Sequence, residues 1–271
     1  MGLGAARAMA AHFNVMVDKL AQCFVAGPPL VAYTEGRKLT KDELGGPDIH
    51  GANGTIDNIA NSELDAMNQI KKFLSYMPIN AWTLPRHELC IDTVDRYDER
   101  LNTIISHERN TIYDIRELIQ YIVDMNLTSQ QSTWFEIGRT WGRAAVVGFA
   151  RLDGYVVGIL ASDCMYSGGS LTASASQKMK RHIELCNSFH IPILNLIDMP
   201  GFAVGLEYEK QSTIKYGTSF LVSLYQSTVP LYSVIIRRCF GVAGAGLADS
   251  REHTGNQRVA WPSGDWYVHT V

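Results

Sequence analysis

The sequence lacks the cysteine and histidine patterns of a disulfide framework, a zinc site or a hydrolytic triad. Only 5 of its 271 residues are cysteines, and no two have Cys-x-x-Cys spacing. An odd number without such spacing indicates buried thiols in a reducing compartment. The histidines show no His-x-x-x-His spacing, and no Ser–His–Asp arrangement can be inferred. We therefore expect neither a metal centre nor a side-chain nucleophile.

Strong charge of one sign is also lacking, as is a long apolar run. The formal net charge is -3, which offers no electrostatic footprint for nucleic acid. No run reaches the ~18 apolar residues that a membrane span needs, and the N-terminus shows no signal-peptide pattern. Hydrophobic residues make up 46% of the chain, which argues against disorder. The sequence predicts a folded, soluble, intracellular protein with no nucleic-acid or membrane partner.

The most informative stretch that is present is 191–205, IPILNLIDMPGFAVG. Its first half is largely apolar and β-branched, as in a strand buried on both faces. Asp198 then ends the apolar run, and Gly201 and Gly205 permit chain paths that other residues resist. The pattern predicts a strand followed by a ligand-binding turn.

Strands and helices alternate from residue 155 onward. Asp153-Gly154 predicts a hairpin turn between strands 144–150 and 155–161. The later segments predict strands at 191–197 and 229–236, with helices at 172–189 and from about residue 213. Repeated strand–helix–strand units imply parallel strands with right-handed crossovers. The loops after these strands should gather at one end, which is the predicted site.

The first half of the chain has a weaker pattern. We expect these elements there: a helix at 5–24, a strand at 30–33, a capped helical turn at 39–44, a helix at 62–77, a linker at 79–107 and a helix at 110–124. The first helix should pack on strands that the sequence does not contain. An exposed apolar patch over Phe13, Met16 and Leu20 is therefore predicted.

The glycine-rich turn Gly241–Gly246 has three interpretations. A dinucleotide fingerprint is disfavoured, because G-x-x-G-x-G is not G-x-G-x-x-G. An oxyanion site is the second, because backbone N–H groups at a helix start can hold a negative oxygen. A tight packing turn is the third.

Charged residues beside these turns also leave alternatives open. Asp198, Glu207 and Glu209 are candidates for acid–base chemistry, or else a cap and two solvated charges. Arg237 and Arg238, at the end of the third strand, either meet an anionic ligand or lie exposed.

Several motifs in order resemble a known family, the β-subunit type of biotin-dependent acyl-CoA carboxyltransferases. The segments that resemble it are Gly27-Pro28-Pro29, Glu43-Leu44-Gly45-Gly46 with His50, Phe73–Pro78, Phe135–Gly138, Gly142-Arg143, Asp198–Phe202 with Gly205, Glu207–Lys210 and Gly217, Gly241–Gly244, and Ala260–Trp266. The resemblance implies a crotonase-like α/β fold, a ββα superhelix, with one near-complete unit and the C-terminal remnant of a preceding one. It implies residues 1–78 as the end of an N-terminal carboxyltransferase domain, 79–107 as a linker and 108–271 as a C-terminal carboxyltransferase domain. Against the family, the chain looks truncated at both ends.

The resemblance also implies the chemistry and the site. A carboxyl group would move from carboxybiotin to the α-carbon of a short acyl-CoA, propionyl-CoA or acetyl-CoA, through an oxyanion-stabilised enolate. The implied site residues are Val242, Ala243 and Gly241 for the biotin-side oxyanion turn, Gly2 and Leu3 for the acyl-CoA side, and Gly201, Phe202, Gly205 and Gly244 for substrate binding.

The implied surroundings follow from the same family. Biotin would be bound to a separate carrier, because the attachment motif Ala-Met-Lys-Met is absent from this sequence. A biotin carboxylase or carrier subunit, a homo-oligomer, and the cytoplasm or mitochondrial matrix are implied. Three alternatives stay open: a non-catalytic subunit that only associates with carboxylase subunits, a biotin-dependent decarboxylase subunit, and a crotonase-type hydratase or isomerase.

Overall fold

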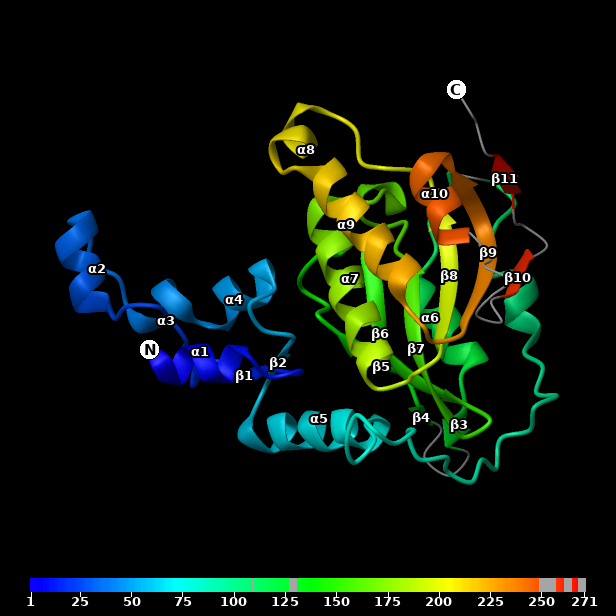
Figure 1. Ribbon diagram of the computed structural model, residues 1–271, viewed down its shortest axis with the longest axis horizontal. Helices are drawn as coiled ribbons and strands as arrows, with labels where there is room; N and C mark the ends of the chain where they lie inside the picture. Colours follow the sequence, from blue (N-terminus) through cyan, green and yellow to red (C-terminus); the bar gives the residue numbers. More distant parts are fainter. Residues whose placement is uncertain (109, 127–130, 249–256, 261–264, 268–271) are drawn as a thin grey trace. The chain divides into compact units, whose positions relative to one another are not determined.

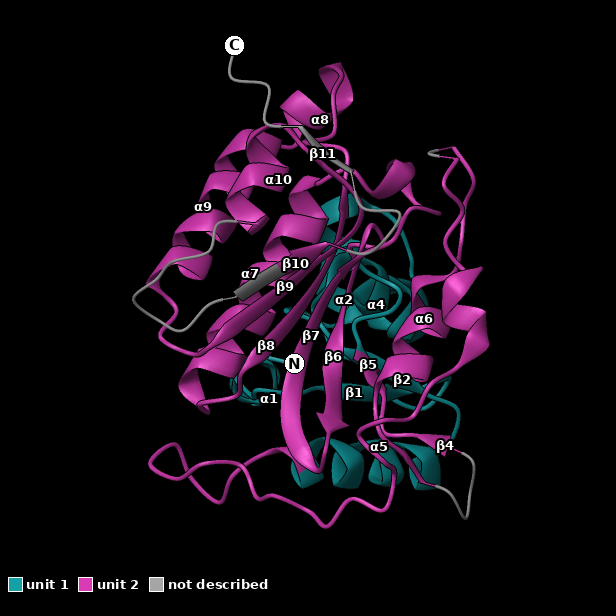
Figure 2. Cartoon of the chain, turned by 90° about the vertical axis from the view of Figure 1, so that its right-hand side faces the viewer, with its two compact units in different colours: residues 1–75, 137–141 teal, residues 76–136, 142–271 magenta. Residues whose placement is uncertain are grey.

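The computed structural model describes residues 1–108, 110–126, 131–248, 257–260 and 265–267. The chain divides into two compact units (Figure 2). The first contains residues 1–75 and 137–141, and the second contains residues 76–136 and 142–271. The division into residues 1–78, 79–107 and 108–271, which was predicted from the sequence, is not tested by these two units and stays a prediction.

The first unit is built of short helices and one pair of short strands. Its elements are α1 (Leu3–Met9), β1 (Val15–Val17), α2 (Pro28–Glu35), α3 (Lys41–Gly45), α4 (Pro47–Asn53), β2 (Asn58–Ala60) and α5 (Glu63–Tyr76), whose last residue belongs to the second unit. Strands β1 and β2 pair in parallel, with Val15 opposite Asn58. Helix α3 begins with the predicted capping box, in which Glu43 N donates to Thr40 Oγ1 and Thr40 N donates to Glu43 Oε2.

Two predictions for the first unit are wrong. The helix predicted at 5–24 ends at Met9, and the β-branched Val15 and Val17 form a strand instead, because β2 provides a parallel partner. The strand predicted at 30–33 lies inside α2. Two prolines stand in the first turn of α2, where a missing N–H costs nothing and the fixed φ suits a helix.

The exposed patch predicted over Phe13, Met16 and Leu20 is found only at Leu20, which is 58% exposed. Met16 is buried in the β1–β2 pair. Phe13 stacks on Phe73 of α5, with ring centroids 4.7 Å apart. The apolar face therefore has partners within the unit itself.

The second unit contains a central sheet with helices on both faces. Its helices are η1 (Glu99–Asn102), α6 (Ile115–Ile122), η2 (Ser167–Gly169), α7 (Ala173–Ser188), α8 (Leu206–Lys210), α9 (Thr213–Gln226) and α10 (Gly241–Ala248). Its strands are β3 (Met125–Asn126), β4 (Gln131–Ser132), β5 (Phe135–Ile137), β6 (Ala145–Leu152), β7 (Tyr155–Ser162), β8 (Ile193–Met199), β9 (Leu231–Phe240), β10 (Gln257–Ala260) and β11 (Asp265–Tyr267). Residue Ile137 of β5 belongs to the first unit.

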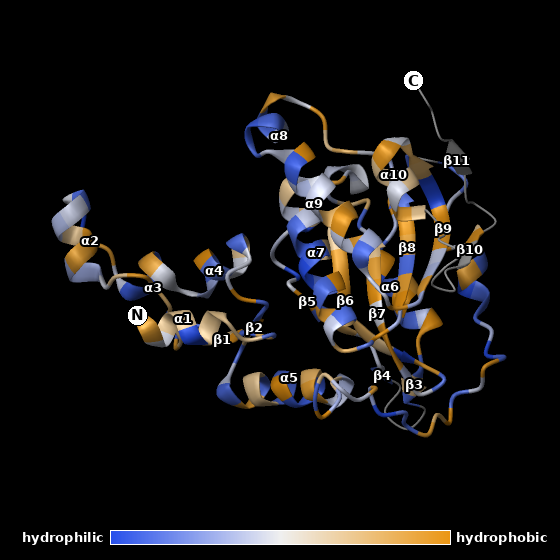
Figure 3. Ribbon diagram, viewed as in Figure 1, coloured by the Kyte–Doolittle hydropathy of each residue, from blue (hydrophilic) through white to orange (hydrophobic). Residues whose placement is uncertain are grey.

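The sheet order is β10-β9-β8-β7-β6-β5, and β11 also pairs with β9 (Figure 1). Strands β7, β8 and β9 are parallel, as predicted, and β6 pairs with β7 in an antiparallel hairpin. The hairpin turn is the predicted one, with positive φ at Asp153 and Gly154. The apolar character of the central strands is visible in Figure 3.

Each face of the sheet has its own helical cover. Val157, Ile159 and Ala161 of β7 share a core cluster with α6. The alternate residue Gly158 faces α7, where an added Cβ would lie 2.4 Å from Cys186 Sγ. Figures 1 and 2 show α7 and α9 on one side of the sheet and α6 on the other. Burial on both faces explains why these strands are apolar throughout rather than alternating.

The helix predicted at 110–124 is shorter than expected, because α6 begins after Asp114. The Asp114 carboxylate accepts a hydrogen bond from Arg116 N, which caps the helix. Residues 79–107 have no regular structure except η1, and they are attached to the β6–β7 hairpin, where Glu88 N donates to Gly154 O. Among the described residues, no helix has the length and apolar character needed to cross a membrane.

We expect Leu118→Ala to lower the free energy of unfolding by about 2–5 kcal/mol, because Leu118 is fully buried between α6 and the sheet. Urea denaturation measures the change. The matched control is Leu89→Ala in the same unit, where the side chain is 90% exposed and the expected change is within about 0.5 kcal/mol. Equal losses for the two variants would show that α6 is not part of the core.

Candidate functional site

The loops after β7, β8 and β9 come together at the carboxyl end of the sheet, as the predicted topology requires. Leu171 and Phe202 form an isolated parallel bridge, which joins the loop after β7 to the turn after β8. A Cβ added to Gly201 would lie 3.9 Å from Phe240 O, at the end of β9. The sequence therefore placed the loop cluster correctly.

The turn after β9 has the geometry expected of a backbone anion site. Gly241 has φ +62° and begins α10, and a Cβ added to it would meet nothing within 4 Å. The first N–H groups of a helix have no acceptor within that helix. Among the described residues, the N–H groups of Val242 and Ala243 have no other acceptor. As residues, Val242 is 70% exposed, whereas Ala243 is fully buried.

The other glycines of α10 are required for packing. A Cβ added to Gly244 would lie 2.7 Å from the carbonyl carbon of Cys239, and one added to Gly246 would lie 2.6 Å from Leu221 Cδ2. Both glycines are buried. Close packing of α10 on β9 and α9 therefore explains these two glycines, and the substrate-binding role of Gly244 stays a prediction.

The turn after β8 includes two glycines with positive φ, 130° at Gly201 and 133° at Gly205. The ring of Phe202 packs on Gly217 of α9, where an added Cβ would lie 2.1 Å from the ring. Ala203 N donates to Leu171 O, and Leu171 N donates to Gly201 O. These contacts fix the path of the turn.

Asp198, at the end of β8, is fully buried and accepts several hydrogen bonds. Its Oδ1 accepts from Arg238 Nε at 2.6 Å, and its Oδ2 accepts from Arg237 Nη2 at 2.9 Å and from the Tyr113 hydroxyl at 3.1 Å. Burial alone would raise the pKa of Asp198. The hydrogen bonds and charges of Arg238 and Arg237 outweigh burial and hold this pKa below its usual range. Asp198 is thus an ion-paired structural carboxylate rather than a proton carrier.

The two arginines of β9 are not exposed as one of the two alternatives had it, and whether they meet an anionic ligand stays a prediction. Arg237 is buried and also donates to Thr111 O at 2.5 Å, and Arg238 donates to Gly168 O at 2.8 Å. Both therefore bond to protein groups around Asp198. Glu207, in contrast, is 74% exposed and pairs with Lys210, as expected of a solvated charge.

A second buried ion cluster lies at the end of β7. Arg116 donates to both oxygens of Glu136 and, at 2.6 Å, to Asp163 Oδ2. Lys178 of α7 is buried and donates to Ala145 O at 2.7 Å. Burial lowers the pKa of Lys178 to about 7, although the carboxylate of Glu136 opposes this shift.

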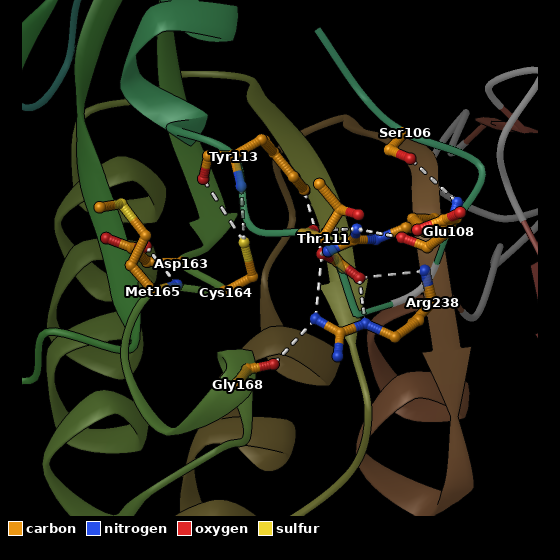
Figure 4. Close-up of polar contacts among 11 residues, drawn as sticks. Ser106, Glu108, Thr111, Tyr113, Asp163, Cys164, Met165, Gly168 and Arg238 are labelled. Carbon is orange, nitrogen blue, oxygen red and sulfur yellow. Dashed lines mark hydrogen bonds and ion pairs between the residues drawn. The ribbon is translucent and has the colours of Figure 1, made fainter.

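The segment before α6 joins the two clusters. Tyr113 exchanges hydrogen bonds with Cys164 through both its N–H and its carbonyl (Figure 4), while its hydroxyl donates to Asp198. Sequence reasoning missed Tyr113, Arg116, Asp163 and Lys178. Two sequence features could have identified part of this cluster. Asp163 is a charged residue shortly after a predicted strand, and Lys178 is a charged residue on the apolar face of a predicted helix.

The turn at Gly2 in the first unit has a similar local geometry. Gly2 has φ 61° and precedes α1, and a Cβ added to it would meet nothing within 4 Å. Leu3 is 68% exposed. Gly2, directly before α1, and Gly241, the first residue of α10, thus both have positive φ and no atom within 4 Å of an added Cβ. The described residues contain no group of three His, Cys, Asp or Glu side chains that could hold a metal ion.

Comparison with known proteins identifies the family of this fold and site. Residues 1–266 match the carboxyl transferase domain family. The chain belongs to this family, and the crotonase-like α/β fold implied by the resemblance is confirmed. Part of the matched Ala260–Trp266 motif lies outside the described residues.

Curated relatives and solved structures agree with this assignment. The chain is 34% identical over 259 residues to the biotin-dependent acetyl-/propionyl-coenzyme A carboxylase beta5 subunit of Mycobacterium tuberculosis, covering 93% of this chain and 46% of that protein. It is 31% identical to the mitochondrial propionyl-CoA carboxylase beta chain of Sus scrofa, with the same coverage. Transcarboxylase 12S, solved with methylmalonyl-coenzyme A bound, superimposes with a TM-score of 0.90 at 29% identity, over 98% of this chain and 50% of that chain. The chain spans about half the length of the curated relatives it matches.

We expect Asp198→Asn to lower the free energy of unfolding at pH 7 by about 3–5 kcal/mol, because two guanidinium groups lose their buried counter-charge. A carboxylate with a lowered pKa stabilises the fold above the unfolded pKa near 4, and this stabilisation is lost as the pH falls through the folded pKa. The difference between wild type and variant should therefore shrink below about pH 4. Urea denaturation across pH measures it, with the exposed Glu207→Gln as control.

We expect Lys178→Met to remove a rise in stability at alkaline pH. Between the folded pKa of about 7 and the unfolded value near 10.4, the unfolded chain binds more protons at Lys178, so wild-type stability rises with pH. The gain over the variant should approach about 1.4 kcal/mol per pH unit. Urea denaturation at pH 7 and pH 9.5 measures it, and the exposed Lys210→Met should match wild type at both. Parallel curves for wild type and Lys178→Met would contradict the lowered pKa.

Proposed function

We propose that this chain is the carboxyltransferase component of a biotin-dependent acyl-CoA carboxylase. The reaction would move a carboxyl group from carboxybiotin to the α-carbon of a short acyl-CoA, propionyl-CoA or acetyl-CoA. Membership of the family and the names of the relatives support the class. The observation that supports the chemistry best is the N–H of Val242, which has no acceptor among the described residues and follows a glycine that leaves open space.

The residues at Gly241 suit the ureido group of biotin. A ureido oxygen is a hydrogen-bond acceptor, and the Val242 N–H is a donor without an acceptor among the described residues. Bound carboxybiotin would supply the carboxyl group. Val242, and Ala243 behind it, would hold the oxygen on which negative charge develops, and the positive end of α10 favours that charge.

The acyl-CoA side is assigned to Gly2 and Leu3 by family resemblance. Their turn has the same positive φ and the same open space as Gly241. The N–H groups of Leu3 and its neighbours would stabilise the thioester oxygen of the enolate. Gly201, Phe202 and Gly205 would line the substrate side of the turn after β8.

Side-chain acid–base chemistry has little support in the second unit. Asp198 and Asp163, the buried carboxylates at the carboxyl ends of β8 and β7, are each ion-paired with arginine. A crotonase-type hydratase would need a free acid–base pair beside the thioester. The arrangement instead favours a reaction that depends on positioning and on backbone dipoles.

The proposed partners follow from the same relatives. The biotin-dependent relatives imply a biotin carrier and a biotin carboxylase subunit, and the transcarboxylase 12S structure is described as a hexamer. We therefore propose a homo-oligomer of this chain that receives biotin from another protein. The alternatives are a non-catalytic subunit that only associates with carboxylase subunits, and a biotin-dependent decarboxylase subunit.

We expect Val242→Pro to lower kcat for carboxyl transfer by ~10²–10³, because it deletes one oxyanion donor. Proline is tolerated in the first turn of a helix, so the fold should be kept. Val242→Ala is the matched control, because it shortens the side chain but keeps the N–H. Transfer of labelled carboxyl from a carboxybiotin carrier to propionyl-CoA measures the rate.

The same assay separates the alternatives. Wild type that transfers no label, alone or with an intact carboxylase subunit added, would exclude the proposed activity. Recovery of carboxylase subunits with the inactive chain would then support the non-catalytic role. Equal rates for Val242→Pro and Val242→Ala in an active protein would show that the Val242 N–H is not an oxyanion donor.

A further inference from the structure

Strand β9 has an irregularity just before the oxyanion turn. Ile197 of β8 pairs with Ile235 of β9, but Met199 pairs with Cys239. One residue of β8, Asp198, therefore stands opposite three residues of β9. A bulge of this kind bends the strand and redirects the chain beyond it, and Gly241 comes two residues after Cys239.

The carboxylate of Asp198 occupies the place of the missing ladder hydrogen bonds. The backbone N–H of Arg238 donates to Asp198 Oδ1 at 3.1 Å instead of to a strand carbonyl. The Arg238 side chain adds donations from Nε at 2.6 Å to the same oxygen and from Nη2 at 3.1 Å to Oδ2. Main chain and side chain of one residue thus hold one carboxylate, which fixes the shape of the bulge.

The bulge is mechanically coupled to the start of α10. Cys239, directly after Arg238, donates from Sγ to Gly244 O at 3.2 Å, and Gly244 packs against the Cys239 backbone with no room for a Cβ. Arg238 Nη2 also reaches Gly168 O in the loop after β7. A change in the bulge would therefore move Gly241 and Val242 relative to β8 and to that loop.

We propose that Arg238 and Asp198 are positioning residues for the Val242 N–H. Their ion pair sets where the oxyanion donor stands, although neither side chain contacts the substrate in the proposed reaction. The inference rests on the proposed function for its catalytic consequence, but its structural part is independent of activity. Displacing a reacting or stabilising group by about 1 Å can cost ~10² in rate.

Arg238→Lys tests the proposal, because lysine keeps the positive charge but lacks the guanidinium group that donates to both Asp198 and Gly168 O. Arg116→Lys is the matched control, since Arg116 is a buried arginine in the neighbouring ion cluster at β7. Gly241-Val242 is the only Gly-Val pair in the sequence. Labelling with carbonyl-¹³C glycine and ¹⁵N valine therefore gives a single amide signal, which belongs to Val242.

We expect Arg238→Lys to shift the Val242 amide signal and to lower kcat ~10–100-fold, with the KM for acyl-CoA changed less than about 3-fold. Arg116→Lys should lose stability but leave the signal and kcat close to wild type. An unshifted Val242 signal in folded Arg238→Lys would overturn the proposal. If Arg238→Lys does not fold, Arg238→Gln, which keeps a donor for Asp198, is judged by the same outcomes.

The activity assay and the Val242 amide signal test the proposed function and the positioning role separately. Wild type without carboxyl transfer would defeat the proposed function, yet the Val242 signal would still decide whether Arg238 positions the turn. An active wild type, with the signal shifted in Arg238→Lys but kcat unchanged, would defeat the positioning role alone. Equal shifts in both lysine variants would show a general loosening of the fold and would also overturn it.

Discussion

One buried carboxylate determines how the carboxyl end of the sheet is built. Asp198 is the common acceptor for two consecutive arginines of β9 and for Tyr113, which stands just before α6. Removing it would leave two guanidinium groups, one buried and one largely buried, without their main counter-charge. The ends of β8 and β9 and the entry to α6 therefore depend on a single side chain.

Side chains and backbone have different roles at this end of the sheet. The charged side chains at the carboxyl ends of β7 and β8 hold elements together through buried ion pairs. The backbone N–H of Val242, in contrast, has no acceptor among the described residues. In the proposed reaction, a backbone donor of this kind matters more than a side-chain base.

Much of the second unit was predictable from local pattern. The run at 191–197 and the turn at Asp153-Gly154 fix strands by neighbouring residues alone, and parallel topology then collects the loops. The ion clusters were not predictable, because Tyr113 and Asp198 are 85 positions apart in sequence. The helix predicted at 5–24 failed for a similar reason, since the partner of β1 lies at 58–60.

The close packing of α10 on β9 and α9 affects how sequence variation in this protein should be interpreted. Gly244 and Gly246 are buried, and a methyl group on either would meet a close neighbour, the Cys239 backbone at Gly244 and the Leu221 side chain at Gly246. A substitution there would look like a core defect far from any ligand. Because the helix that it displaces begins at Gly241, such a substitution would also shift the turn at Gly241. Tolerance to mutation in α10 thus reports on the position of that turn as well as on the packing of the core.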